Sequence, residues 1–270
     1  MTLRGPGLID QSEAARQAAL LRRHPRESLT VFFPMYNEED NLHAAVASAA
    51  EILQTLTDDY EILLVDDAST DRTGTMAEEL AAADPRIRVI HHARNLRLGG
   101  ALKTGFAHAT KDLILYSDAD YPFDMIELVK AVRIMRQADV VSAYRFDRTG
   151  EGPLRTLYSF GWNLLIKLLF GLRVKDVNFS FKLVRRKVFE NVHLKSESSF
   201  IDAELLIRCQ YCGYRILQMG VDYFPRSRGI STLSSFGTIR KMASEMFRLY
   251  PELQALRRRQ RAPEPPASAS

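Results

Sequence analysis

Short apolar runs alternate with longer amphipathic stretches from residue 29 onward. Runs with the length and composition of buried strands lie at residues 29–33, 60–65, 87–91, 112–116 and 140–143. Segments in which apolar residues recur with the helical period of 3.6 cover residues 39–56, 73–83, 100–109 and 125–137. Asn37 and Asp71 are suited to cap the first two helices. The repeated strand and helix pattern predicts an α/β fold with a mostly parallel central sheet flanked by helices.

The pattern changes after residue 150. A long apolar and basic helix is expected at residues 153–171, followed by a β-like run at 177–184, a helix through Glu204 and a strand at 215–223. These elements should complete the sheet and shape an acceptor site. We expect four parts: an N-terminal arm or helix at residues 1–28, a main domain at 29–235, a basic amphipathic helix at 236–262, and a disordered tail rich in Pro, Ala and Ser at 263–270.

Composition and charge narrow the possible partners. The chain has 270 residues, 46% of them hydrophobic and 26% charged, which is typical of a globular protein. Its formal charge of +4 suits an anionic partner. Nucleic acid is not indicated, because the basic residues gather in one terminal helix without interleaved stacking aromatics. Cys209 and Cys212 form a C-x-x-C without a second pair, which favours idle thiols in a reducing compartment over a zinc site.

No segment has the pattern of a signal peptide or a membrane span. The first 28 residues scatter arginines among short apolar pieces, and the best apolar stretch, residues 164–172, is interrupted by Lys167. These observations favour a cytoplasmic location.

Residues whose side chains could bind a ligand follow the first two predicted strands. In parallel sheets, ligands bind at these strand ends. After the first strand come Pro34, Tyr36 and Glu38: the tyrosine can stack on a base, and the carboxylate can accept hydrogen bonds from a base or a ribose. The same segment could merely turn the chain into a helix. After the second strand, Asp66 and Asp67 are adjacent, which is costly unless they meet donors or a cation.

The loop at residues 94–100 contains two arginines and two glycines before a helix. Arg94 and Arg97 could neutralise a pyrophosphate that approaches Gly99 and Gly100 at the helix start. Tight packing of that helix explains the glycines equally well.

The clearest chemical signal follows the strand at 112–116. Asp118 and Asp120 lie two residues apart at a strand end and so face the same side, where they can share a hard divalent cation that also bridges phosphate oxygens. Such an ion assists a departing nucleoside diphosphate as a Lewis acid. The simpler alternative is a polar strand end before a turn at Pro122.

These motifs, in this order, resemble glycosyltransferase family 2, whose fold is of the GT-A type. The resemblance rests on Asn37 and Glu38, on residues 66–71 and on residues 118–120. Downstream segments are similar to polyprenyl-phosphate glycosyltransferases of the dolichyl-phosphate mannosyltransferase kind; they are residues 141–145, 176–182 with Arg185, 200–204 and 226–231. The resemblance runs from about residue 29 to residue 233.

The resemblance implies roles for individual residues. The nucleotide would be bound by Pro34, Tyr36, Glu38, Asp66, Asp67 and Asp118. The metal, Mn²⁺ or Mg²⁺, would be held by Asp120 with Asp118. The acceptor phosphate would be bound by Arg145, Arg155, Ser159, Lys182, Arg226, Arg228 and Ser231.

The sequence departs from the family pattern at two positions. Pro122 stands where a Gln is frequent, so water, phosphate oxygens or Asp124 would complete the metal shell. Thr232 stands where a Lys is frequent, and Arg226 or Arg228 would replace that charge.

The expected activity is an inverting, metal-dependent transfer of a sugar from a nucleotide diphosphate-sugar to a polyprenyl phosphate. A phosphate monoester is already anionic near neutral pH, so it needs no general base. Transfer to a sugar hydroxyl is the alternative, and it would need a base such as Asp202 or Glu204. A noncatalytic nucleotide-sugar binder is a third, remote reading, suggested by Pro122 and Thr232 and opposed by the aspartate pair.

The helix at 154–172 has apolar residues on all sides, from Trp162 to Phe170. It is either a core helix or a second apolar surface. With the arginines that end the last helix, Arg257, Arg258, Arg259 and Arg261, that surface could rest on an anionic bilayer and receive a lipid carrier. We therefore expect a peripheral protein at the inner face of the membrane.

Overall fold

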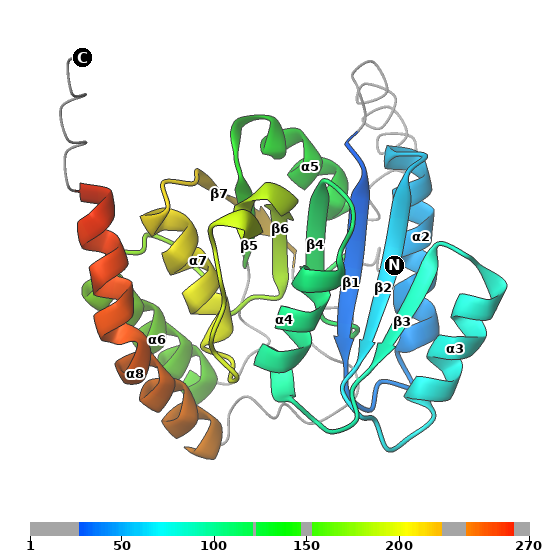
Figure 1. The fold of residues 1–270 in the computed structure, drawn as a ribbon, viewed down its shortest axis with the longest axis horizontal. Helices are drawn as coiled ribbons and strands as arrows, with labels where there is room; N and C mark the ends of the chain where they lie inside the picture. Colours follow the sequence, from blue (N-terminus) through cyan, green and yellow to red (C-terminus); the bar gives the residue numbers. More distant parts are fainter. Residues whose placement is uncertain (1–26, 121–122, 147–152, 223–235, 262–270) are drawn as a thin grey trace, which may run out of the picture.

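The computed structural model describes residues 27–120, 123–146, 153–222 and 236–261, with residues 153–155, 236 and 261 described by their backbone alone. Its centre is a seven-stranded sheet in the order β3-β2-β1-β4-β6-β5-β7 (Figure 1). The strands are β1 Leu29–Met35, β2 Tyr60–Asp66, β3 Ile87–His91, β4 Leu113–Ser117, β5 Val140–Arg145, β6 Phe181–Arg185 and β7 Ile216–Val221. Only β6 runs antiparallel to its neighbours, β4 and β5. The predicted α/β class with a mostly parallel sheet is confirmed.

Helices cover both faces of the sheet. One face packs against α2 Leu42–Leu56, α3 Thr73–Ala83, α5 Glu127–Ile134 and the 3-10 turn η1 Met135–Gln137. The other packs against α4 Arg97–His108, α6 Pro153–Phe170, α7 Ile201–Tyr211 and α8 Phe236–Arg261, with the turn η2 Arg186–Glu190 following β6. Within the described residues, no helix is both long enough and apolar enough to cross a bilayer.

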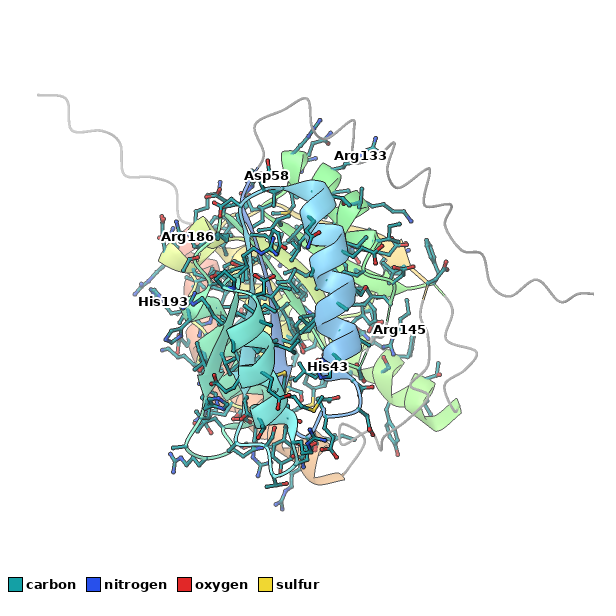
Figure 2. The ribbon with its side chains drawn as sticks, turned by 90° about the vertical axis from the view of Figure 1, so that its right-hand side faces the viewer. His43, Asp58, Arg133, Arg145, Arg186 and His193 are labelled. Carbon is teal, nitrogen blue, oxygen red and sulfur yellow. The ribbon has the colours of Figure 1, made fainter. Side chains whose placement is uncertain are left out.

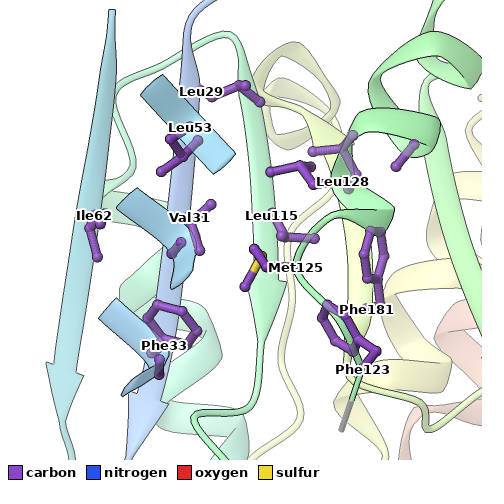
Figure 3. Close-up of a cluster of buried hydrophobic side chains, with 14 of the residues drawn as sticks. Leu29, Val31, Phe33, Leu53, Ile62, Leu115, Phe123, Met125, Leu128 and Phe181 are labelled. Atoms are coloured by element: carbon purple, nitrogen blue, oxygen red, sulfur yellow. The ribbon is translucent and has the colours of Figure 1, made fainter. Parts of the chain in front are cut away.

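Alternate residues of the central strands supply the two cores. Val31 and Phe33 of β1 lie beneath α2 and belong to the same hydrophobic cluster as Leu53 (Figure 3). Phe32 points to the opposite face, where its ring lies 4.9 Å from that of Phe106 in α4. A Cβ atom at Gly105 would lie 2.2 Å from the Phe32 ring, so the missing side chain lets α4 approach the sheet. The sheet is therefore buried on both faces, as parallel sheets are.

Several predicted boundaries were wrong. Helix α2 begins at Leu42 instead of residue 39, and Asn37 does not cap it: Asn37 is left-handed, with φ of 58°, and accepts a hydrogen bond from the backbone N–H of Thr70. Helix α4 begins at Arg97 instead of residue 100, and the strand expected at 177–184 starts only at Phe181. Asp71 does bond to the start of α3, accepting from the N–H of Thr73 at 2.9 Å.

Helix α6 is apolar on two sides, each with a different environment. Ile166 and Phe170 are fully buried, and the Trp162 indole N–H donates to Asn178. A second row on the same helix is exposed: Leu157, Phe160, Leu164 and Leu168. The apolar surface expected from Trp162 to Phe170 is corrected accordingly, since Trp162 and Phe170 belong to the inner side.

The strand directions separate two edges of the molecule. The parallel strands β1 to β4 end at the lower edge in Figure 1, where α4 and α8 begin. In Figure 2, His43 near the start of α2 lies toward this edge, whereas Asp58 and Arg133 lie at the opposite end. Loops that follow β1, β2, β3 and β4 therefore meet at one place.

Candidate active site

A cavity of about 1220 Å³ opens at this carboxyl edge. Six of the residues predicted to bind nucleotide or metal line it: Pro34, Tyr36, Glu38, Asp67, Asp118 and Asp120. Its volume is somewhat above the range of about 300–1,000 Å³ that is typical of small-molecule sites. The structure thus gathers in one hollow residues that the sequence distributes over three strand ends.

The loop after β1 presents Tyr36 and Glu38. Tyr36 is 48% exposed, so its ring face is accessible to a ligand. The backbone N–H of Glu38 donates to Thr73 at 2.8 Å, and Asn37 exchanges hydrogen bonds with Ser69 and Thr70. These bonds join the loop after β1 to the loop after β2 and hold both side chains at the cavity.

The adjacent carboxylates after β2 have different surroundings. Asp67 lines the cavity and accepts hydrogen bonds at 2.7 Å from the backbone N–H of Leu96 and from Nδ1 of His92. Asp66 is not among the lining residues; it accepts from the N–H of Ser69 and from Nδ1 of His91. Burial raises the pKa of Asp66, but these hydrogen bonds outweigh burial and leave its pKa below the ordinary value. Asp67 is thus the better placed of the two to meet a nucleotide.

Both aspartates after β4 line the cavity, and both carry their charge close to the buried Tyr116. Burial raises the pKa of the Tyr116 phenol well above its ordinary value, and the charges of Asp118, Asp202 and Asp120 raise it further. Carboxylates therefore gather around the end of β4. An electropositive group is the natural counterpart of such a gathering.

A divalent cation fits the Asp118 and Asp120 pair. The described residues contain no group of three or more His, Cys, Asp or Glu side chains arranged to hold a metal. Mg²⁺ usually binds through one or two carboxylates and completes its shell with water and substrate phosphates. Two hard oxygen donors that share a cavity large enough for a nucleotide meet that requirement. Asp124 is not at the cavity; it accepts from the N–H of Ile126 at the start of α5.

Lys182 and Asp202 form a buried pair and do not line the cavity. Their N–O distance is 2.8 Å, and the exposures of the two side chains are 0% and 2%. Burial raises the pKa of Asp202 to about 6; Lys182 lowers it, whereas the charges of Asp118 and Asp176 raise it. Because Lys182 has a carboxylate partner and also donates to the carbonyl of Phe179, the geometry does not support its predicted contact with the acceptor phosphate.

Glu204 is fully buried on α7 and is fully engaged. Its carboxylate accepts from the backbone N–H groups of Lys195 and Ser196 and from the Arg208 guanidinium, at 2.7 to 3.1 Å. These bonds fix the segment before α7 and leave Glu204 poorly placed to act as a general base.

The predicted acceptor-phosphate residues are only partly described. Arg145, at the end of β5 (Figure 2), makes a bidentate pair with Asp176 at 2.7 and 3.1 Å. Neither Arg145 nor Ser159 is among the cavity-lining residues, and the Ser159 carbonyl accepts from Asn163. The side chain of Arg155 lies outside the described residues, as do Pro122, Arg226, Arg228, Ser231 and Thr232.

Residues 30–192, well over half of the chain, match the model of glycosyl transferase family 2. The chain belongs to glycosyltransferase family 2.

Curated relatives include three prokaryotic enzymes. Glycosyltransferase AglD of Haloferax volcanii is 31% identical over 234 residues, which cover 83% of this chain. The match spans only 37% of that relative's length. Polyprenol monophosphomannose synthase of Mycolicibacterium smegmatis is 28% identical, with 85% of this chain and 88% of the relative covered. Undecaprenyl-phosphate mannosyltransferase of Micrococcus luteus is 27% identical, with 74% and 85% covered.

Solved structures of other glycosyltransferases share the fold. Mannosyltransferase PcManGT of Pyrobaculum calidifontis, in complex with GDP-Man and Mn²⁺, has a TM-score of 0.61 at 18% identity, covering 91% of this chain and 76% of its own. Glucosyl-3-phosphoglycerate synthase of Mycobacterium tuberculosis, in complex with Mn²⁺ and UDP-glucose, has a TM-score of 0.61 at 20% identity, covering 92% and 85%. The GT-A fold expected from the motifs is confirmed.

This family 2 member also has cavity residues that sequence reasoning missed. Arg240 and Lys241 of α8 line the cavity, as does Ser198 before α7. No spacing in the sequence indicates them, because their position depends on how α8 packs against the domain. His92 does not line the cavity, but it positions Asp67 by joining it to Thr104 of α4. It could have been found, because it directly follows the third strand, at the edge where ligands bind.

Proposed function

We propose that this protein transfers a sugar from a nucleotide diphosphate-sugar to a polyprenyl phosphate, with one divalent cation, Mn²⁺ or Mg²⁺, held by Asp120 with help from Asp118. The observation that carries the proposal is the common cavity of these two aspartates with Tyr36, Glu38 and Asp67. An aromatic ring and acceptors for ribose or base hydrogen bonds lie beside a donor set for a hard cation. A nucleoside diphosphate needs all three.

The cation would supply charge for the departing nucleoside diphosphate as a Lewis acid. The protein's own part is to hold donor and acceptor in line and to place the compensating charges in advance. Asp67, which is fixed by Leu96 and His92, would orient the nucleoside without having to reorganise. The similar structures with GDP-Man or UDP-glucose and Mn²⁺ support this choice of donor.

The burial of the two candidate bases favours a phosphate acceptor. Asp202 and Glu204 are 2% and 0% exposed, and both have cationic partners. A phosphate oxygen is already ionised near neutral pH and can attack the anomeric carbon without such a base. The names of the relatives from Mycolicibacterium smegmatis and Micrococcus luteus support a polyprenyl phosphate. Inversion at the anomeric carbon is what membership of the family implies.

One observation keeps a second function open. With a pKa of about 6, Asp202 would be deprotonated at neutral pH and basic enough to accept a proton from a sugar hydroxyl. That reaction would require the segment around Asp202 to open, because its carboxylate does not reach the cavity in this structure. Transfer to a hydroxyl of a polysaccharide or glycolipid is therefore the alternative.

The outer side of α6 supports contact with a membrane. Leu157, Phe160, Leu164 and Leu168 recur every three or four residues and are 43 to 73% exposed. At the far end of α8, Arg258 and Arg259 are exposed as well. An apolar helix face together with basic side chains is the composition of a peripheral contact with anionic lipid, here at the cytoplasmic face.

A donor and acceptor screen tests the proposed function. Nucleotide sugars are incubated with Mn²⁺ or Mg²⁺ and either a short polyprenyl phosphate or a sugar acceptor, and products are identified by mass. We expect a glycosylated polyprenyl phosphate that is not formed in chelator. Faster glycosylation of a free sugar hydroxyl would move the conclusion to the alternative function, and absence of any transfer with all donors would contradict both.

A further inference from the structure

Acidic and basic residues lie on different sides of the cavity. Its carboxylates come from the loops after β1, β2 and β4, such as Glu38, Asp67 and Asp118. Among the described lining residues, the basic side chains come from helices instead: Arg97 from α4, and Arg240 and Lys241 from α8. The strand side therefore suits a nucleoside and a cation, and the helix side suits an anion.

A short segment before α7 fixes the two basic helices to each other. The backbone N–H of Gly99, two residues after Arg97, donates to the carbonyl of Glu197 at 3.2 Å. A Cβ atom at Gly99 would lie 2.4 Å from the backbone of Glu197, so only glycine allows this approach. On the other side, Glu245 of α8 accepts from the N–H groups of Glu197 and Ser198 and from the Ser198 hydroxyl at 2.6 Å. Arg97 and Lys241 thus each lie within about one helical turn of a residue that bonds to this segment.

The cations themselves have little internal neutralisation. Within the described part of the chain, Arg97 and Arg240 form no ion pair, and Lys241 lies 3.9 Å from the largely exposed Glu197. Arg97 also holds a left-handed backbone, with φ of 62°, which costs an ordinary residue free energy and is typical of functional sites. Within the described residues, two of these cations therefore have no carboxylate partner and the third has one distant partner, which leaves all three available to a ligand.

We propose that Arg97, Arg240 and Lys241 form a phosphoryl-binding subsite on the α4 and α8 side of the cavity, preorganised by the contacts of Gly99 and Glu245 with residues 197–198. The planar guanidinium groups suit the bidentate recognition of phosphate oxygens, and the lysine adds a point charge. The choice of ligand rests on the proposed function, which supplies two sources of phosphate: the diphosphate of the donor and the phosphate of the acceptor.

The test compares Arg240→Ala/Lys241→Ala with a control of equal charge loss, Arg133→Ala/Arg136→Ala, on exposed residues outside the cavity lining. Calorimetry measures binding of pyrophosphate, of UDP and GDP, and of uridine and guanosine. Acceptor KM is measured with a short polyprenyl phosphate. Pyrophosphate binding should weaken about ten- to hundredfold in the cavity variant alone, because each lost contact is a charge-assisted one.

These measurements distinguish the donor diphosphate from the acceptor phosphate as the ligand of the subsite. They also distinguish failure of the subsite from failure of the proposed function. Weaker binding of UDP or GDP with unchanged nucleoside binding assigns the subsite to the donor, and a raised acceptor KM with unchanged diphosphate binding assigns it to the acceptor. Pyrophosphate binding that depends on Arg240 and Lys241 supports the subsite even where no sugar is transferred, a result that would count against the proposed function alone. Equal behaviour of the cavity variant and its control overturns the subsite.

A second variant tests the preorganisation. Gly99→Ala keeps all three cations but must displace α4 from residue 197. At temperatures where thermal melts show this variant to be folded, it should bind pyrophosphate several-fold more weakly than wild type does. Wild-type affinity in this variant would overturn the fixed arrangement.

Discussion

At the residue scale, the proposed metal site in the cavity depends on the two aspartates after β4. Asp118 and Asp120 add negative charge where Asp202 and the buried Tyr116 already lie. Like charges that lie close together destabilise one another's ionised forms unless a cation neutralises them. A divalent ion would therefore bind both the protein and the diphosphate. Without it, the negative charge of the departing nucleoside diphosphate would not be neutralised.

Asp120→Asn should reduce transfer by about a hundred- to a thousandfold at saturating Mn²⁺, because it removes a charge while keeping the side-chain shape. Initial rates of sugar transfer measure this. Asp58→Asn, at the opposite end of the molecule (Figure 2), is the matched control and should retain its rate. Full activity of Asp120→Asn, or undiminished transfer in chelator, would remove the metal from the mechanism.

A second prediction concerns the pair of Arg145 with Asp176, whose side chains are 9% and 1% exposed. Arg145→Ala removes a bidentate partner from a buried carboxylate and should lower the free energy of unfolding by about 3–5 kcal/mol. Denaturant unfolding measures the change. Arg88→Ala is the comparison: Arg88 is 42% exposed, and its partner Glu61 keeps hydrogen bonds from Thr30 and Thr110, so its cost should be clearly smaller.

The predicted role of Arg145 at the acceptor makes a separate demand. If Arg145 contacts the acceptor phosphate, the variant's acceptor KM should rise far more than its nucleotide Kd, at temperatures where it stays folded. A stability loss with an unchanged acceptor KM would leave Arg145 a structural residue.

Single residues were predictable where the strand end alone fixes them. Tyr36, Glu38, Asp67, Asp118 and Asp120 line the cavity because each follows a parallel strand within a few residues. Lys182 and Glu204 were expected at the reaction centre, yet they meet Asp202 and Arg208 inside the domain. A sequence shows that a charge exists, but the partner that neutralises it is decided by packing.

At the element scale, a histidine connects β2, β3 and α3. His91, the last residue of β3, places Nδ1 2.8 Å from Asp66 and Nε2 2.8 Å from Glu78. The hydrogen bond to Asp66 is the main cause that raises the pKa of His91; burial opposes it and Glu78 adds to it. Protonated His91 therefore joins two strands and a helix.

The two pKa shifts define the pH range of this connection. The His91 pKa is raised above 6.5, so its contribution to stability is complete below 6.5 and is lost as pH rises through the folded-state value. The Asp66 pKa is lowered below 3.8, so its contribution is present above 3.8 and is lost as pH falls through the folded-state value. Both contributions are therefore present between pH 3.8 and pH 6.5.

His91→Gln should lower Tm by a few degrees near pH 5.5, and the difference from wild type should shrink as pH rises above 6.5 and through the raised folded-state pKa of His91. The effect is small because the His91 side chain is 43% exposed, and pairs at the surface contribute at most about 1 kcal/mol. Thermal melts across pH 4 to 9 measure it. His43→Gln, on the exposed side of α2, is the control, and a difference for His91→Gln that does not vary with pH would exclude titration of this histidine as the cause.

Elements were predicted better than their ends. The apolar runs located the strands and most helices because burial on both faces of the sheet leaves a strong pattern. The starts of α2 and α4 were missed because Asn37 and Arg97 are left-handed, a conformation that local propensity does not favour at an arginine. The antiparallel direction of β6 also had no local signal, since it follows from the long path through α6.

At the scale of the whole molecule, two surfaces of different character are candidates for two different partners. The cavity at the carboxyl edge is polar and charged, whereas the outer side of α6 is apolar. The last helix contributes to both: Arg240 and Lys241 lie at the cavity, and Arg258 and Arg259 are exposed near its other end. Arg257 points inward instead, 5.8 Å from the ring of Tyr211. One helix thus connects the site to the proposed membrane surface.

The last prediction is that the protein binds anionic vesicles reversibly through the α6 stripe and the end of α8, and that both are required. Each basic side chain near an anionic surface contributes about 1 kcal/mol, so Arg258→Ala/Arg259→Ala should weaken vesicle binding at least tenfold. Leu164→Ser/Leu168→Ser should weaken it at least as much, because two leucines would no longer enter the lipid. Flotation with phosphatidylserine vesicles measures both variants.

Arg133→Ala/Arg136→Ala loses the same charge at exposed positions in and just after α5, outside both α6 and α8, and should bind vesicles like wild type. Salt at about 1 M reduces the screening length to about 3 Å and should release the wild-type protein. Transfer to a short, soluble acceptor analogue should be retained in every variant, because none of these residues lines the cavity. Wild-type protein that ignores anionic vesicles at low salt would contradict the membrane surface, and with it the reason to expect a lipid carrier at this face of the domain.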